Sequence, residues 1–221
     1  MKGKMRQVAA KFNAMLLLGA PGTGKGTQGK MLGTLPGVLH VAMGDIFRAL
    51  DKNSELGRIF GEYSTKGLLV PDEFVVKLWK QHMDKLVAGG KYEPADDLLV
   101  LDGIPRNVNQ AKALEQYVIV SKIVVLRCKH GIESIIQRMK DRALKEGRAD
   151  DANEATIRRR FEVYDAETAP VLAHYPKRLR TEVDALQMPI EVAHDVLSAV
   201  LGRTNELHTI QQPPPLVPAR R

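Results

Sequence analysis

The sequence has a single cysteine, few aromatic residues and no apolar run of membrane-spanning length. Cys128 is the only cysteine among 221 residues, which excludes an internal disulfide and a zinc site built from cysteines. It follows the apolar run 123–126, so we expect it to pack at the end of a strand. This cysteine usage predicts a reducing, cytoplasmic setting. The lack of long apolar runs predicts no membrane association.

The sequence also lacks any long run of lysine or arginine, although its formal net charge is +7. A basic balance can indicate nucleic-acid binding, but aromatic residues make up only 5% of the chain. The arginines gather between residues 138 and 160, which suits a pocket for small, highly charged phosphates. We therefore expect no nucleic-acid partner. Steeply salt-dependent DNA binding would favour that alternative.

The most informative segment is a glycine-rich loop that follows three leucines. Residues 16–27 read Leu-Leu-Leu-Gly-Ala-Pro-Gly-Thr-Gly-Lys-Gly-Thr. The glycines let successive backbone N–H groups converge on one anion. The helix expected from Gly24 adds the positive end of its dipole, and Lys25 adds a charge for the β- and γ-phosphates. The segment predicts a nucleotide site.

One residue in this loop departs from the general pattern. Gly26 stands where a Ser or Thr usually binds magnesium, and a hydroxyl follows only at Thr27. We therefore expect magnesium to be held mainly by phosphates, waters and a carboxylate elsewhere in the chain.

Short apolar runs alternate with helical patterns, which is typical of a parallel sheet with helices on both faces. Strands are predicted at 15–18, 38–42, 98–101, 121–126 and 179–184. Helices are predicted at 24–35, 71–88, 107–116, 132–143, 154–174 and 189–201. The expected fold class is α/β, with a three-layer parallel-sheet core. Two stretches, 44–70 and 142–153, fit this alternation poorly and are predicted to be excursions from the core.

A second motif is the apolar run 98–101, which ends on Asp102. A carboxylate at the end of a buried strand, beside a phosphate loop, can hold magnesium or its waters. A simple turn or helix cap is the alternative. The segment Gly103-Ile-Pro-Arg106 then places an arginine at the carboxyl edge of the sheet, where ligands bind in open α/β folds.

A third feature is a set of arginines at helical spacing. Arg138 and Arg142 are four residues apart and lie together beside the predicted inward stripe of Ile132, Ile135, Ile136, Met139 and Ala143. In the later helix, the predicted inward face holds Ile157, Phe161, Tyr164, Thr168 and Val171.

Arg160 borders this second face, whereas Arg158 and Arg159 turn toward solvent. Helical spacing therefore selects Arg160 from a run of three arginines. A solvated basic face is the alternative explanation for the set Arg138, Arg142, Arg148 and Arg160.

Five motifs in this order resemble the adenylate kinases, within the nucleoside monophosphate kinase family. They are GAPGTGKGT at 19–27, GDIFR at 44–48, GLLVPDE at 67–73, DGIPR at 102–106 with Gln110, and GRADD at 147–151. The similarity runs from about Met15 to Leu201. It implies a P-loop kinase core of 13–42, 72–140 and 153–202, a monophosphate-binding lobe at 43–71 and a short lid at 141–152. An N-terminal tail, 1–12, and a flexible proline-rich tail, 203–221, flank these parts.

The resemblance implies a role for each matching position. ATP would contact Gly22, Thr23, Gly24, Lys25, Gly26, Thr27, Arg138, Arg142 and Met188. AMP would contact Met43, Arg48, Leu68, Leu69, Val70, Gly103, Ile104, Pro105, Arg106, Gln110, Arg148 and Arg160. The catalytic set would be Lys25, Arg106, Arg142, Arg148 and Arg160, and Asp102 would hold Mg²⁺ through water. Only five residues separate Arg142 from Arg148, which leaves no room for the family's zinc-bearing long lid, so no zinc is implied.

Gln110 bears on the choice of acceptor. A primary amide can accept from the adenine N6 amine and donate to ring N1. The family's pyrimidine kinases carry asparagine at this position, so the resemblance favours AMP. Two positions depart from the family pattern: Met43 stands where threonine is common, and Ile104 where an aromatic residue is common.

The implied reaction is MgATP + AMP ⇌ 2 ADP, in line, without a covalent intermediate and in a competent monomer. Transfer between phosphates depends on charge neutralisation and alignment, which fits many arginines and no evident nucleophile. A UMP/CMP kinase of the same family remains an alternative. A P-loop ATPase or switch protein is a second, although no Asn-Lys-x-Asp guanine motif is present.

Overall fold

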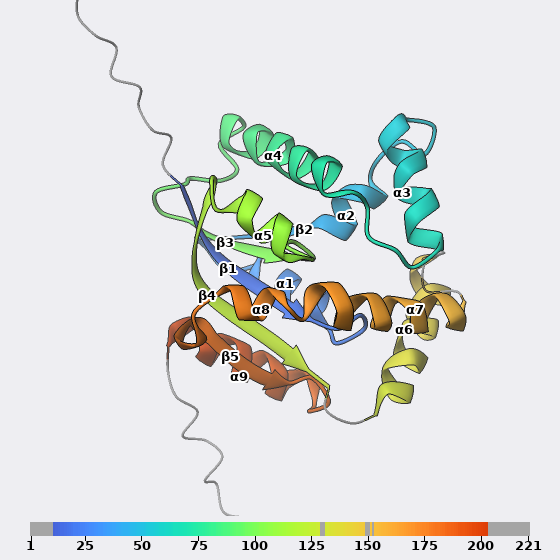
Figure 1. Ribbon diagram of the computed structural model, residues 1–221. Helices are drawn as coiled ribbons and strands as arrows, with labels where there is room; N and C mark the ends of the chain where they lie inside the picture. Colours follow the sequence, from blue (N-terminus) through green and yellow to red (C-terminus); the bar gives the residue numbers. More distant parts are fainter. Residues whose placement is uncertain (1–10, 129–130, 149–150, 152, 203–221) are drawn as a thin grey trace, which may run out of the picture.

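Five parallel strands form one sheet in the order β2-β3-β1-β4-β5 (Figure 1). The computed structural model describes residues 11–128, 131–148, 151 and 153–202. Most of both predicted tails, and residues 149, 150 and 152 of the predicted lid, lie outside these ranges. The strands are β1 Phe12–Gly19, β2 Val38–Ala42, β3 Leu98–Asp102, β4 Val118–Arg127 and β5 Arg180–Asp184. The predicted α/β class and all five predicted strands are confirmed.

The central strand β1 is covered on both faces. Its residues 14–17 have no exposed surface, as expected for a parallel strand between two helical layers. Leu16 and Leu18 point into one apolar cluster, and Met15 and Leu17 point into another. This alternation explains why the strand is an unbroken apolar run in the sequence.

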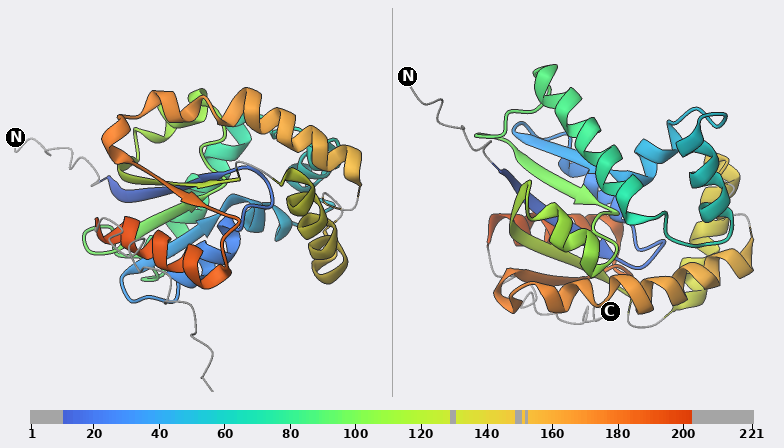
Figure 2. Two further views of the ribbon diagram at one scale, coloured as in Figure 1. Left: turned by 90° about the horizontal axis from the view of Figure 1, so that it is seen from below. Right: turned by 45° about the horizontal axis from the view of Figure 1, so that its top comes forward.

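Helices form a layer on each face of this sheet (Figures 1 and 2). Apolar side chains of α4 (Asp72–Ala88), α5 (Val108–Leu114) and α8 (Val171–His174) belong to the first cluster. Those of α1 (Lys25–Leu32) and α9 (Pro189–Leu201) belong to the second. The predicted three-layer core is confirmed, and a short 3₁₀ turn, η3 (Lys177–Leu179), leads into β5.

Two helical excursions stand beyond the carboxyl ends of the strands, at the end of the molecule opposite the start of β1 (Figure 2). The first contains α2 (Met43–Arg48) and α3 (Glu55–Thr65). These two helices correspond to the short helical pieces predicted for 44–70. The second holds α6 (Ile132–Glu146) and α7 (Glu154–Val163), which share a small apolar cluster with Cys128. Cys128 follows β4 directly, so its predicted packing role is confirmed. The hydroxyl of Thr156 on α7 donates to the carbonyl of Thr65 at 3.2 Å and joins the two excursions.

The predicted helix 154–174 was wrong in one respect, because it is not continuous. After α7 the backbone widens into a π-helical turn, η2 (Tyr164–Thr168), in which the Ala169 N–H donates to the Tyr164 carbonyl at 2.8 Å. Pro170 comes two residues after the end of this turn and has no N–H for a helical hydrogen bond. The widened turn accommodates the proline, and such turns often occur at functional sites.

The helix predicted at 132–143 also differs from α6. It continues to Glu146 and ends where Gly147 takes a left-handed conformation, with φ of 63°. The first half of the segment predicted as a lid is therefore helical. Ile132 is 45% exposed, so the inward stripe begins at Ile135. Among the described residues, no helix is both long and apolar enough to cross a membrane.

The carboxyl end of α9 is held by a lysine from the sheet. The ammonium of Lys122 on β4 donates to the carbonyl of Ala199 and to that of Val200, the latter at 3.0 Å. A cation at this helix end also interacts favourably with the helix dipole.

Replacing this lysine should lower stability. We expect Lys122→Met to reduce the free energy of unfolding by about 1–2 kcal/mol, the scale of charge-assisted hydrogen bonds. The matched control is Lys177→Met, because Lys177 is exposed in η3. Urea unfolding followed by circular dichroism measures both. Equal unfolding midpoints for the two variants would contradict the role of Lys122.

Candidate active site

The glycine-rich loop joins β1 to α1 and packs against the second excursion. Gly22 and Gly24 both adopt left-handed backbone conformations, with φ of 79° and 94°. A Cβ on Gly22 would lie 2.5 Å from Cγ2 of Ile135 on α6, so only glycine fits there. The loop therefore leads into the N-terminus of α1 as the sequence predicts, with its backbone close to α6.

Lys25 at the start of α1 folds back over this loop. Its ammonium donates to the carbonyl of Gly19 at 2.7 Å and to that of Ala20 at 2.9 Å. Burial lowers the pKa of Lys25 from 10.5 to about 8; the charge of Asp102 opposes this shift, and nearby arginines add to it. The lysine is therefore held in a strongly cationic site whose free energy falls when an anion binds.

Asp102 is the last residue of β3 and lies beside the N-terminus of α1. It is 8% exposed, and a Cβ added to Gly26 would lie 3.8 Å from its Oδ2 atom. The imidazole Nε2 of His40 lies 3.7 Å from the same oxygen. One carboxylate beside a phosphate loop suits magnesium, which commonly binds one or two carboxylates together with substrate phosphates and waters. The residues present therefore fit Mg²⁺.

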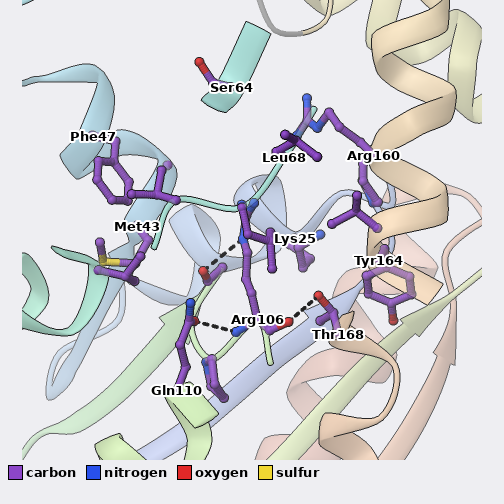
Figure 3. Close-up of a pocket in the computed structure, with 18 of the residues that line it drawn as sticks. Lys25, Met43, Phe47, Ser64, Leu68, Arg106, Gln110, Arg160, Tyr164 and Thr168 are labelled. Carbon is purple, nitrogen blue, oxygen red and sulfur yellow. Dashed lines mark hydrogen bonds between the residues drawn. The ribbon is translucent and has the colours of Figure 1, made fainter. Parts of the chain in front are cut away.

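Four cationic side chains from separate elements line one pocket at the carboxyl edge of the sheet. Lys25 comes from α1, Arg48 from α2, Arg106 from the loop after β3, and Arg160 from α7. Figure 3 shows Lys25 and Arg106 at the centre of this pocket, with Arg160 on the helix beside them. We call it the acceptor pocket. Its other lining residues include Met43, Phe47, Leu68, Leu69, Val70, Gly103, Pro105, Gln110 and Thr168.

Arg106 is held by hydrogen bonds of both its side chain and its backbone. Its Nε donates to the carbonyl of Gly103 at 3.1 Å, and its own carbonyl accepts from the hydroxyl of Thr168 at 2.7 Å. Thr168 ends the π-helical turn η2, so the irregular turn reaches the site. The Ile104–Pro105 peptide just before Arg106 is cis.

Arg48 is held by an acid on its own helix. Its Nη2 lies 2.6 Å from Oδ1 of Asp45. Burial opposes ionisation of Asp45, but the hydrogen bond and charge of Arg48 outweigh it and lower the pKa of Asp45. The charge of Arg148 also lowers the pKa of Asp45.

A second pocket lies on the other side of the glycine-rich loop. We call it the donor pocket; it is lined by Gly22, Thr23, Gly24, Thr27, Gln28, Arg138, Met139, Arg142, Ala185, Gln187, Pro189 and Val192. Arg138 donates from Nη1 to the carbonyl of Ala185 at 3.3 Å, which fixes it across the pocket. The loop and Lys25 thus lie between two pockets, each lined by arginine.

Asp151 connects the two pockets and was missed as a functional residue by the sequence analysis. Its side chain is fully buried and pairs with Arg142 of the donor pocket and Arg160 of the acceptor pocket. Nε of Arg142 donates to its Oδ2 at 2.9 Å. The motif at 147–151 contains this acid, but nothing in the local sequence shows that two distant arginines meet there.

Five predicted site residues line neither pocket, and one of them is Asp102, which lies beside the N-terminus of α1. Ile104 is completely buried in the core, and the Met188 side chain is 62% exposed next to Pro189 of the donor pocket. Gly26 lies beside Asp102, and Arg148 pairs with Glu146 at 2.6 Å. The solvent-facing positions predicted for Arg158 and Arg159 are confirmed, because their side chains are 46% and 55% exposed, against 17% for Arg160.

A parallel sheet with a phosphate loop between two arginine-lined pockets is typical of P-loop phosphotransferases. The model of one protein family, adenylate kinase, matches residues 17–180. The adenylate kinase of Thermobifida fusca is 37% identical over 196 residues, covering 86% of this chain and 98% of that protein. That of Mycobacteroides abscessus is 37% identical over 193 residues, covering 86% and 99%. Adenylate kinase 1 of Synechocystis sp. is 38% identical over 173 residues, covering 76% and 86%.

The chain therefore belongs to the adenylate kinase family, as its five motifs predict. It is a nucleoside monophosphate kinase, an enzyme that transfers a phosphoryl group between nucleotides.

The lowered pKa of Lys25 predicts an alkaline limb in the pH profile. As the pH rises through about 8, the free enzyme loses the ammonium charge that binds phosphates. We expect kcat/KM for MgATP to fall above this pH and to approach a tenfold loss for each further unit. With saturating MgATP the limb should move to higher pH, because bound phosphates favour the charged lysine. A kcat/KM that stays level to about pH 9.5 would contradict this assignment.

Proposed function

We propose that the chain catalyses MgATP + AMP ⇌ 2 ADP, with AMP bound in the acceptor pocket and ATP in the donor pocket. The observation that carries this proposal is the convergence of Lys25, Arg48, Arg106 and Arg160 on one pocket. The phosphates of two nucleotides repel each other strongly when they are brought together. Several cationic side chains held in fixed positions offset this repulsion.

The phosphate loop and α1 bind the polyphosphate of the donor. Backbone N–H groups of the loop surround the phosphates, and Lys25 reaches the group that is transferred. Arg138 lies over the donor base, and Arg142 neutralises charge on the phosphates. This assignment is supported by the place of both arginines in the donor pocket.

Arg48 and Arg106 bind the acceptor monophosphate. Gln110, whose side chain is almost completely buried, meets the acceptor base, and Leu68–Val70 lies along the acceptor nucleoside. Met43 offers an apolar contact in this pocket. The acceptor phosphate oxygen is already anionic near neutral pH, so the reaction needs alignment more than proton transfer.

Arg160 and Arg142 act on the phosphates in transit, because Asp151 pairs with one arginine of each pocket. Arg148 joins them when the segment at 141–152 closes over the nucleotides. Closure excludes water, which would otherwise hydrolyse ATP and weaken each electrostatic interaction.

Asp102 would hold Mg²⁺ through water, close to the loop. When bound, the ion supplies charge neutralisation between the donor phosphates. All four cations of the acceptor pocket come from one chain, which supports a competent monomer. The cytoplasm is the proposed location, in keeping with the single cysteine.

Removal of Arg106 tests the acceptor assignment. We expect Arg106→Ala to lower kcat/KM by about 10²–10³, the scale for losing one positioned contact to the developing charge. Arg159→Ala is the matched control, because Arg159 is exposed and pairs with Glu162 on its own helix. A coupled assay of ADP formation measures both variants. A near-normal rate for Arg106→Ala would remove this arginine from the mechanism.

Initial rates with four acceptors test the choice of substrate. At fixed MgATP we expect AMP to exceed UMP, CMP and GMP, because the Gln110 amide matches the adenine edge. Faster turnover of UMP or CMP would instead identify a pyrimidine monophosphate kinase. A control without acceptor measures ATP hydrolysis alone, and a rate equal to that with AMP would favour the ATPase alternative.

A further inference from the structure

The amide of Gln110 is held by one partner at each end. Its Oε1 accepts from the backbone N–H of Arg106 at 2.8 Å. Its Nε2 donates to Oδ1 of Asp72 at 2.8 Å. Gln110 itself is only 1% exposed and borders the acceptor pocket, so the ligand has to meet the amide in this fixed setting.

These partners determine which end of the amide is oxygen. A backbone N–H can only donate, and a carboxylate can only accept. If the amide turned by 180°, its oxygen would face the Asp72 carboxylate and its NH₂ group would face the Arg106 N–H. Both contacts would be repulsive, so the observed polarity is the stable one.

Asp72 is itself held in place from the start of α5. Asn107 caps this helix by accepting from the Gln110 backbone N–H at 2.8 Å through its Oδ1. The Nδ2 of Asn107 then faces Asp72 and donates to the same Oδ1 atom at 2.8 Å. The first turn of α4 is thereby fixed to the residue that borders the acceptor base.

The amide retains one hydrogen-bond donor and one acceptor for a ligand. A primary amide has two N–H donors and two acceptor sites on oxygen, and the residues that the structure describes use one of each. The remaining Oε1 site can accept from an exocyclic amine, and the remaining Nε2 proton can reach the adjacent ring nitrogen. Adenine offers this amine and bare nitrogen at N6 and N1. A 6-oxopurine offers a carbonyl and an N1–H, the reverse arrangement.

We propose that Asp72 is a positioning residue that makes the acceptor pocket select 6-aminopurine over 6-oxopurine monophosphates. The inference rests on the proposed function, because it assumes that the acceptor base meets Gln110. Asp72 acts through Gln110 and does not itself contact the nucleotide. It works by preventing the amide from turning to the orientation that would suit a carbonyl and an N1–H.

The test compares AMP with inosine 5′-monophosphate (IMP), which differs at position 6 of the base. The unaltered enzyme should prefer AMP by at least about 100-fold in kcat/KM. With IMP, the Gln110 oxygen would face the base carbonyl and the Gln110 NH₂ group would face the N1–H, so neither pair could form a hydrogen bond. In Asp72→Ala one of the two groups that orient the amide is gone. We expect the AMP/IMP ratio to fall by about tenfold or more, mainly through KM for the acceptor.

Two further variants separate positioning from structure. Glu73→Ala removes the same charge from the same turn of α4, but at an exposed position, and should leave the ratio unchanged. Asp72→Asn keeps an oxygen acceptor at the same place and should keep the ratio within about threefold. Thermal denaturation reports the folded fraction of each variant. If Asp72→Ala unfolds, Asp72→Asn still tests the inference, because a ratio outside this range would contradict it.

The possible results of these assays distinguish the inference from its alternatives. An enzyme that uses IMP as well as AMP would overturn the inference, as would an Asp72→Ala variant that loses activity equally toward both acceptors. Failure of the proposed function gives a different result, because the unaltered enzyme would then make no ADP from AMP at all.

Discussion

Lys25 is buried where the charges of three arginines act on it, and the free-energy cost of this charge in the free protein governs the site. The desolvation of its ammonium and the charges of Arg106, Arg160 and Arg142 all lower its pKa, while Asp102 alone among the contributing groups raises it. A lysine with a pKa below its unfolded value destabilises the fold at neutral pH, and this cost lessens as the pH rises from about 8 toward 10.5. Binding of a polyphosphate removes the same cost. The site is therefore built for an anion rather than for its own stability.

Two acids limit this repulsion without neutralising it. Asp102 lies at the end of β3 beside the phosphate loop, where it can serve both Lys25 and a hydrated magnesium ion. Asp151 is fully buried between Arg142 and Arg160, and so holds one cation of each pocket in a common geometry. Buried ion pairs of this kind gain little net stability, but they fix orientation. Orientation is what transfer between two phosphates requires.

Much of the fold could be predicted because its signals are local. The apolar runs that form β1 and β3 are continuous since both faces of each strand are buried. The separation of Arg160 from its two neighbours followed from helical periodicity alone. The π-helical turn η2 was not predicted, because it depends on how the chain accommodates Pro170 while Thr168 reaches Arg106. Ile104 was assigned to the site from its motif, yet its side chain is in the core.

The sequence by itself determined the phosphate loop, since nine consecutive residues contain its glycines, its lysine and the start of its helix. It also determined the family, because five motifs occur in one order. Only the tertiary structure decided which charges meet. Four cations reach one pocket from α1, α2, α7 and the loop after β3, and the polarity of the Gln110 amide depends on Asp72, 38 positions earlier. Such contacts arise from the packing of distant segments, for which no local pattern of residues carries a signal.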